Sequence, residues 1–237
     1  MNSISNTLWP ESPIVPSEDV PSRYWGVWSR TLLRTPEISD STTFVRWMQL
    51  SRWHADLRVP ISPQQGFQGF SGLTQVSERK EGEVCTWHRW VDIQAPRDTP
   101  DEGLMVFETP ERVIETGIHG IYHEVWERLP GSLGQRLVLA QPIQSDGTGG
   151  ARLFVSGQYL MRVRPCKSLD SPFEISFGTW DGQVWRVEQS TITALLGQAV
   201  PLTLSPMNKQ LVLVTINGER PSEWSVLEWE RPETVQD

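Results

Sequence analysis

The chain has few of the features that identify the commoner protein classes. Only two of its 237 residues are cysteines, Cys85 and Cys166, which is too few for a disulfide framework or a Cys-x-x-Cys metal site. No stretch approaches the roughly 20 apolar residues of a membrane-spanning helix, and the N-terminal residues show no basic segment followed by an apolar one. We therefore expect no membrane contact, no secretory signal and a cytoplasmic location. A single bridge between Cys85 and Cys166 stays open.

Positive charge is also scarce. The chain has 21 Lys and Arg residues against 29 Asp and Glu residues, a formal net charge of −8, and it contains no basic run. Because phosphate contacts need clustered lysines and arginines, we expect no nucleic-acid partner. There is no G-x-G-x-x-G sequence, and the glycine-rich segment at 145–150 lacks a phosphate-loop lysine. We expect no cofactor.

Short alternating apolar runs, separated by turn residues such as "WDGQ" at 180–183 and "NGER" at 217–220, fill the rest of the chain. This pattern predicts an all-β fold with tight hairpins. One short helix is expected at 190–198, with Ser190 as its N-cap and Gly197 near its C-cap. The expected strands are 24–34, 43–50, 52–59, 68–77, 83–93, 103–108, 112–117, 120–128, 135–142, 151–156, 158–164, 173–179, 183–188, 201–204, 210–216 and 224–230.

Many antiparallel strands in sequence must protect their edges, and closure into a barrel removes the edges altogether. We therefore predict an antiparallel up-and-down barrel of about eight to ten strands, which is wide enough to enclose one small ligand, with extra strands and little helix. Residues 1–21 are rich in Pro, Ser and Asn, and we expect them to form a flexible N-terminal arm. Residues 22–237 are expected to form a single barrel domain as a monomer or homodimer.

The segment "RYWGVWSR" at 23–30 contains Gly26-Val27-Trp28 at the start of the first long strand. It resembles the G-x-W signature of the lipocalin-like (calycin) barrels, and the chain is similar to uncharacterised bacterial lipocalin-like proteins with "ADLRVP"- and "CTWHR"-type segments. The resemblance covers the first half of the chain well and the second half poorly. It implies that the tryptophan closes one end of the barrel under an arginine late in the chain, for which Arg220 and Arg231 are the two candidates.

Tryptophan is unusually abundant, with 12 Trp against 3 Tyr and 7 Phe. Such residues suit either the aromatic walls of a cavity or a densely packed core. The segment "SRWHADLRVP" at 51–60 poses the same choice, because on a strand His54, Asp56 and Arg58 share one face. That face is either solvated or part of a polar barrel lumen, and the segment alone favours the solvated reading.

Two later strands mix tryptophan with ionisable residues on the same face, as the wall of a ligand cavity does. In one, His88 and Trp90 alternate with Cys85, Trp87 and Arg89; in the other, Tyr122, Glu124, Trp126 and Arg128 share a face. Taken together, the three strands predict a shared pocket. The expected ligand-binding residues are Arg58, Tyr122 and Trp126, followed by Trp90, His54 and Asp56, and the candidate catalytic residues are His88 and Glu124.

The residue types suggest their roles. Arg58 presents a planar fork to a carboxylate or carbonyl group. His88 is able to transfer a proton near neutral pH. Glu124 is either a base with a raised pKa or simply the ion-pair partner of Arg58. Metal binding by His119 and His123, or haem ligation by His88 or His123, is less favoured, and we expect no metal.

The sequence is compatible with three functions, two of which need a pocket. The first is a small-molecule-binding barrel whose ligand is mainly apolar or aromatic and has an acidic or carbonyl group. The second is a cofactor-independent isomerase, cyclase, dehydratase or hydrolase that uses His88 and Glu124. The third is an interaction domain with a filled core.

Overall fold

The computed structural model describes residues 18–62, 66–95, 98–142, 150–166, 172–204, 211–214 and 221–230. The chain divides after Pro130 into two compact units, which we call the N-terminal unit and the C-terminal unit. The single domain expected over 22–237 therefore stays a prediction. Most of the expected N-terminal arm lies outside the described residues. The regular elements in the described ranges are strands and two three-residue 3-10 helices, neither long enough to cross a bilayer.

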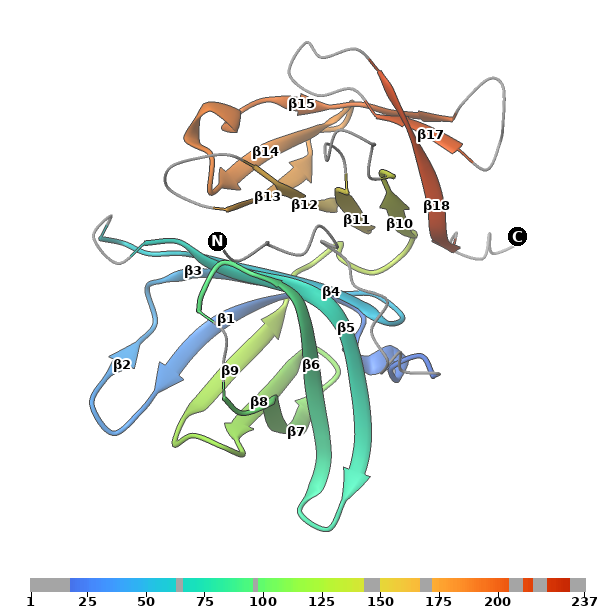
Figure 1. Ribbon diagram of the computed structural model, residues 1–237. Helices are drawn as coiled ribbons and strands as arrows, with labels where there is room; N and C mark the ends of the chain where they lie inside the picture. The colour runs from blue at the N-terminus through green and yellow to red at the C-terminus, as the bar shows by residue number, and fades with distance from the viewer. Residues whose placement is uncertain are drawn as a thin grey trace, which may run out of the picture. The chain divides into compact units, whose positions relative to one another are not determined.

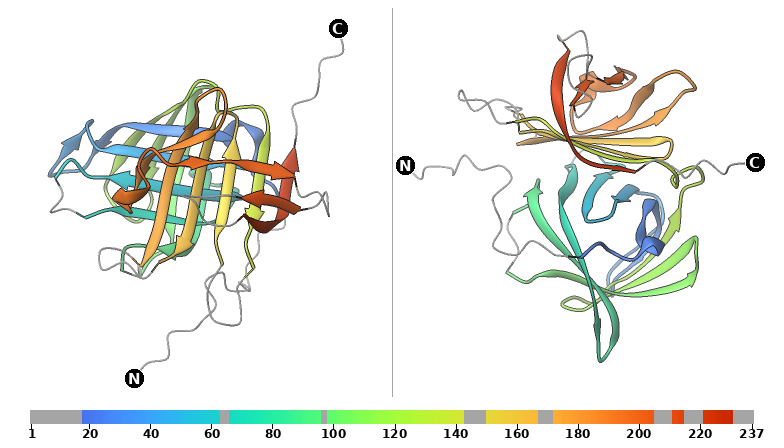
Figure 2. Two further views of the ribbon diagram at one scale, coloured as in Figure 1. Left: turned by 90° about the horizontal axis from the view of Figure 1, so that it is seen from above. Right: turned by 90° about the vertical axis from the view of Figure 1, so that its right-hand side faces the viewer.

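The N-terminal unit is a closed antiparallel barrel (Figure 1, Figure 2). Its sheet runs in the order β2-β1-β3-β4-β5-β6-β7-β8-β9, and β9 pairs back with β1 to close an eight-stranded ring. The predicted up-and-down barrel is thereby confirmed. Its strands are β1 (Gly26–Arg34), β3 (Phe44–Gln49), β4 (Trp53–Val59), β5 (Gln68–Arg79), β6 (Gly82–Asp92), β7 (Asp101–Thr109), β8 (Arg112–Gly117) and β9 (His123–Arg128), and the two-residue β2 (Ser39–Asp40) pairs with the end of β1.

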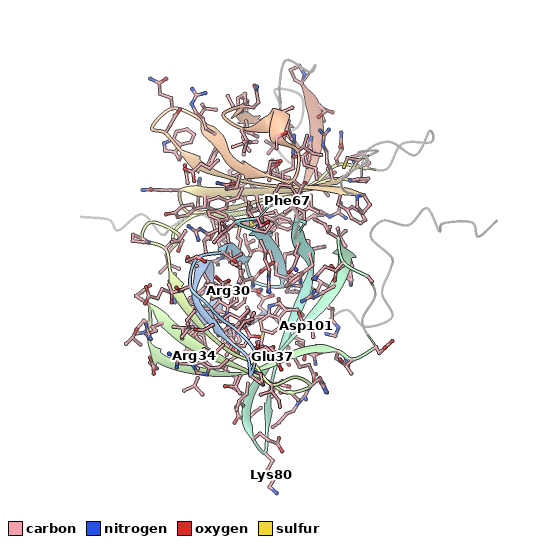
Figure 3. The ribbon with its side chains drawn as sticks, turned by 90° about the vertical axis from the view of Figure 1, so that its left-hand side faces the viewer. Arg30, Arg34, Glu37, Phe67, Lys80 and Asp101 are labelled. Atoms are coloured by element: carbon pink, nitrogen blue, oxygen red, sulfur yellow. The ribbon has the colours of Figure 1, made fainter. Side chains whose placement is uncertain are left out.

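The turns and bulges of the barrel follow from its sequence. The β5–β6 hairpin turns at "KEGE", where Gly82 has a φ of 121°, a value that side-chain-bearing residues rarely adopt. Figure 3 shows Lys80 at the tip of this hairpin. A β-bulge between Arg30 and Leu32 shifts the register of β1 against β9, so that Leu33 rather than Leu32 faces the barrel interior.

One end of the barrel is closed by an aromatic core around Trp28. This residue is fully buried beneath the 3-10 helix η1 (Ser22–Tyr24), whose Tyr24 carbonyl accepts the Trp28 indole N–H at 2.7 Å. The Arg128 guanidinium lies 4.6 Å from the Trp28 ring, and its Nη atoms donate to the carbonyls of Arg23 and Trp25. The arginine over the tryptophan therefore comes from the last strand of the barrel.

The candidates expected for this position, Arg220 and Arg231, lie outside the described residues. The resemblance points to them because it places this arginine late in the chain. The barrel instead closes at β9, so the last barrel strand, and the arginine at its end, lie near the middle of the sequence.

The C-terminal unit is a second antiparallel sheet with its own core. Its order is β15-β14-β13-β12-β11-β10-β18-β17-β16, and its buried cluster includes Leu153, Val155, Trp185 and Trp224. The helix predicted at 190–198 is largely wrong, since only the 3-10 helix η3 (Thr193–Leu195) forms there. The strands are β10 (Arg136–Ala140), β11 (Arg152–Ser156), β12 (Tyr159–Pro165), β13 (Phe173–Trp180), β14 (Trp185–Ser190), β15 (Ala199–Val200), β16 (Leu202–Leu204), β17 (Leu211–Val214) and β18 (Ser222–Glu230).

Candidate functional site: a cavity in the barrel

The interior of the barrel is not completely filled. Above the aromatic core lies a cavity of about 250 Å³. Three tryptophans, one from each of β3, β6 and β9, form part of its wall, and ionisable side chains stand between them. The lining residues are Leu33, Thr35, Trp47, Asp56, Arg58, Phe70, Trp87, Arg89, Asp101, Glu115, Tyr122, Glu124 and Trp126.

Strand register explains why the charged row of β4 faces this cavity. Asp56 pairs with the inward-facing Trp47 of β3, so Asp56 and Arg58 point into the barrel. On the opposite face of β4, Ala55 and Leu57 are also fully buried. Because both faces are buried, the alternation of polar and apolar residues cannot tell inside from outside. The structure places Asp56 and Arg58 in the barrel lumen, so the prediction that the polar face of the segment at 51–60 is exposed to solvent is wrong.

The expected faces of β6 are reversed in the structure. Trp87 and Arg89 line the barrel cavity, whereas His88 and Trp90 lie on the outer face. His88 is half-buried there and lies 3.2 Å from Gln75 through its Nε2 atom. The inward orientation predicted for His88 and Trp90 is therefore wrong. The physical reason is that both faces of β6 contain tryptophan and ionisable residues, and only the face with Trp87 matches the inward residues of β5.

His54 faces inward but lies outside the cavity lining. It is fully buried, and its Nδ1 atom lies 3.0 Å from Thr74 Oγ1. The Gln49 amide donates to two carbonyls, so its Oε1 is the acceptor for the Thr74 hydroxyl proton at 2.7 Å. His54 therefore carries its proton on Nδ1, and burial lowers its pKa well below the usual value. Its place in this network is that of a neutral structural residue.

Arg58 and Glu124, predicted as site residues, belong to an ion-pair chain along one wall of the cavity. Arg58 Nε donates to Asp56 at 2.9 Å, and its Nη1 lies 4.0 Å from Glu124. Glu124 accepts a shorter bond of 2.7 Å from Arg30, which also contacts Asp40. Burial lowers the pKa of Arg58, but Asp56 and Glu124 outweigh it and raise the pKa above its usual value.

Arg89 occupies the other side of the cavity, next to the start of β7. Its guanidinium lies 3.5 Å from the centre of the Phe70 ring, and its Nε donates to Asp101 at 2.9 Å. Asp92 accepts a further bond of 3.0 Å from Arg89. Figure 3 labels Asp101 on this side of the barrel and Arg30 on the other. Both arginines of the cavity lining are thus already bound by carboxylates.

Glu115 differs from the other carboxylates. It is buried, and its two oxygens accept hydrogen bonds from the Tyr122 hydroxyl at 2.7 Å and the Trp126 indole at 3.0 Å. Burial raises its pKa to about 8, and the nearby Glu124 adds to this rise. Burial likewise raises the pKa of Tyr122. The side chain is therefore mostly a neutral acid at pH 7, which makes it suited to proton exchange, and a cation would pair only with its deprotonated form.

Two glycines make room for this pair of side chains. Gly103 on β7 and Gly117 on β8 are opposite each other in the register. A Cβ atom at Gly103 would lie 2.6 Å from Glu115 Cγ, and one at Gly117 would lie 2.3 Å from Tyr122 Cε1. Neither distance is compatible with a methyl group, so the positions of Glu115 and Tyr122 depend on these two glycines.

Sequence reasoning brought together five residues that do line the cavity and missed several more. Those it identified are Asp56, Arg58, Tyr122, Glu124 and Trp126; those it missed include Trp47, Phe70, Trp87, Arg89, Asp101 and Glu115. The only local signal for Glu115 was its place between Val113 and Gly117 on one face of an alternating strand. The described residues bring no group of three His, Cys, Asp or Glu side chains into a metal-binding arrangement, and Cys85 and Cys166 do not form the disulfide bond that the sequence left open.

Comparison with known proteins supports the fold and names no activity. No protein-family model matches the chain, and no curated protein matches it. Among solved structures, the chain is similar to the uncharacterized protein YLR301w of Saccharomyces cerevisiae, with a TM-score of 0.64 and 16% sequence identity over 86% of this chain and 98% of that one. At this identity the likeness concerns the fold alone.

Proposed function

We propose that the barrel of the N-terminal unit binds a small molecule in its cavity. The observation that carries this proposal is the space of about 250 Å³ inside a closed ring of strands, lined by Trp47, Trp87 and Trp126 together with convergent polar groups. A domain that served only as a filled interaction module would have no need of such a space. The short helix η1, Trp28 and Arg128 also favour the lipocalin-like resemblance, in which a barrel closed at one end holds its ligand at the other.

The polar groups restrict the ligand. An apolar or aromatic body suits the indole walls, and a carbonyl oxygen is able to accept a bond from Arg58 without adding charge. An acidic group is disfavoured, because Arg58 is already bound by Asp56 and because carboxyls outnumber arginines on the wall.

The test uses N-phenyl-1-naphthylamine, a dye that is neutral at pH 7 and fluoresces in apolar surroundings. We expect saturable binding to the full-length protein, and we expect the cavity-filling change Leu33→Trp to weaken it at least about tenfold. Leu32→Trp is the matched control, since Leu32 is next to Leu33 on β1 but faces outward. Equal binding by both variants, or none by the wild type, would contradict the proposal.

A second candidate is a cofactor-independent enzyme, favoured by the raised pKa of Glu115 inside the cavity. The predicted pair of His88 and Glu124 does not serve this role, since His88 lies on the outer face. If a substrate is turned over, Glu115→Gln should abolish the reaction while His88→Ala leaves it intact. Loss of turnover in His88→Ala alone would reverse this assignment.

A further inference from the structure

One carboxyl group of the cavity has no cationic partner. Four carboxyl side chains and two guanidinium groups line the cavity, and Glu124 has a further partner in Arg30, which lies just outside the lining. Both guanidinium groups are engaged, Arg58 by Asp56 and Arg89 by Asp101. An anionic ligand would meet no arginine that lacks a carboxylate partner, and it would lie beside the remaining carboxyl groups. The four carboxyl residues are Asp56, Asp101, Glu115 and Glu124.

Glu115 is the member of this set whose carboxyl group, once ionised, has no counter-ion. None of the described residues places a Lys, Arg or His nitrogen within ion-pair distance of it, and its two donors, Tyr122 and Trp126, are neutral. The residue is only 4% exposed, so water contributes little to stabilising a negative charge. A positive group brought by a ligand would supply the missing counter-ion.

The aromatic residues beside Glu115 also favour a cation. The Trp47 ring centre lies 5.7 Å from that of Trp126 and 5.5 Å from that of Trp87, in edge-to-face contacts that form one wall. Indole faces attract cations through their quadrupole, most strongly where water is excluded. The cavity already contains one such contact, between Arg89 and the face of Phe70 at 3.5 Å.

We propose that the ligand of this cavity is an organic cation, a small apolar or aromatic molecule with a protonated amine that the Glu115 carboxylate receives beside the Trp126 indole. The inference rests on the proposed function, since it names the class of ligand for the same cavity. It departs from the acidic ligand that the sequence suggested for Arg58.

Binding of such a ligand has a proton balance that can be measured. The free carboxyl group of Glu115, with a pKa of about 8, holds its proton at pH 7. When an ammonium group pairs with the carboxylate, this proton passes to the buffer, so close to one proton is released for each ligand bound. The affinity for the ammonium ligand should therefore increase about tenfold for each unit by which the pH increases towards about 8, and it should be constant above that pH. The charged and titratable groups that face Glu115 are Arg58 from β4, the buried thiol of Cys85 from β6, Asp101 from β7, Tyr122 just before β9 and Glu124 from β9.

The first arm of the test compares three ligands that share one body and differ in charge: phenethylamine, 2-phenylethanol and 3-phenylpropionate. Isothermal titration of the full-length protein at pH 7 should show phenethylamine binding at least about tenfold more tightly than the other two. Repeating the titration in two buffers of different ionisation heat should show the released proton. Binding of 3-phenylpropionate as tight as that of phenethylamine would overturn the inference.

The second arm of the test changes Glu115, the residue proposed to bind the amine. Glu115→Gln keeps the shape of the side chain and removes its ability to carry a charge. We expect this change to weaken the binding of phenethylamine at least about tenfold and to abolish proton release. The affinity for 2-phenylethanol should change by less than about threefold. Glu78→Gln is the matched control, because Glu78 is exposed on β5 near the hairpin tip. If Glu115→Gln does not fold, the comparison of the three ligands on the wild-type protein tests the inference by itself.

The outcomes separate the two proposals. If N-phenyl-1-naphthylamine binds in the cavity and phenethylamine does not, the inference fails while small-molecule binding stands. If neither compound binds, both fail.

Discussion

Glu115 makes the stability of the barrel depend on pH in an unusual direction. Its pKa is raised from 4.5 to about 8 in the folded protein, so between these values the folded state holds a proton that the unfolded state has lost. The stability contributed by this group is therefore full below about pH 4.5 and is lost as the pH rises towards 8. Most carboxylates paired with cations act in the opposite direction.

We predict that the melting temperature of the wild type falls relative to that of Glu115→Gln as the pH rises from about 5 to about 8, since the glutamine has no proton to lose. Differential scanning calorimetry across this range measures the difference. Glu78→Gln should follow the wild type at every pH. Parallel curves for the wild type and Glu115→Gln would contradict the raised pKa.

Gly103 is a second residue whose identity is dictated by its surroundings. We predict that Gly103→Ala, which places a methyl group 2.6 Å from Glu115 Cγ, lowers the free energy of unfolding by about 1–3 kcal/mol and displaces the Glu115 carboxyl group. Gly120→Ala is the control, because its Cβ would meet Tyr122 at an ordinary 3.6 Å, and a change within about 0.5 kcal/mol is expected. Urea unfolding measures the free energy of unfolding of both variants. Equal changes would show that the Glu115 side chain moves aside at no cost in stability.

At the scale of elements, the pairing of β1 with β9 turns a meander of strands into a barrel. Arg128 stands at this junction, where it pairs directly with Trp28 across the ladder and donates to the carbonyls of Arg23 and Trp25. One side chain thus links the last strand, the first strand and the helix that precedes it.

We predict that Arg128→Ala lowers the free energy of unfolding by about 2–3 kcal/mol, because the carbonyl groups of Arg23 and Trp25 lose their donors and Trp28 loses its cation contact. Arg112→Ala is the control, since Arg112 forms only exposed ion pairs, which contribute little to stability. Urea unfolding followed by tryptophan fluorescence measures both. A smaller effect at Arg128 than at Arg112 would mean that this contact does not close the barrel.

At the scale of the whole molecule, each of the two compact units has a buried core of its own. Leu153 belongs to a cluster made only of residues from the C-terminal unit, whereas Val113 belongs to the cluster around Trp28. Separate cores are typical of regions able to unfold separately.

We predict that Leu153→Ala, which costs about 2–5 kcal/mol in a well-packed core, lowers amide-exchange protection in the C-terminal unit and leaves β1 to β9 protected. Val113→Ala should do the reverse. Hydrogen exchange with mass spectrometry of the full chain tests both variants. An equal loss of protection in both units would instead support the single domain expected from the sequence.

Sequence alone is enough to locate most of the strands and the all-β class, because alternation, β-branched residues and turn pairs are local properties. The strand expected at 68–77 is β5 at Gln68–Arg79, and the run expected at 112–117 matches β8. Alternation also groups residues correctly by face, since it places Tyr122, Glu124 and Trp126 on one face, and all three line the cavity. It does not say which face is inside.

Tertiary structure decides that remaining question through strand pairing. His88 and Trp87 are neighbours in the chain, and only the register against β5 shows that the tryptophan enters the cavity and the histidine does not. The closure of β9 on β1 in mid-chain, and the position of Glu115 above Gly103 without a cation, likewise arise from contacts between segments distant in sequence or between facing strands. Such contacts fix charge balance and burial, and these in turn set the chemistry of the cavity.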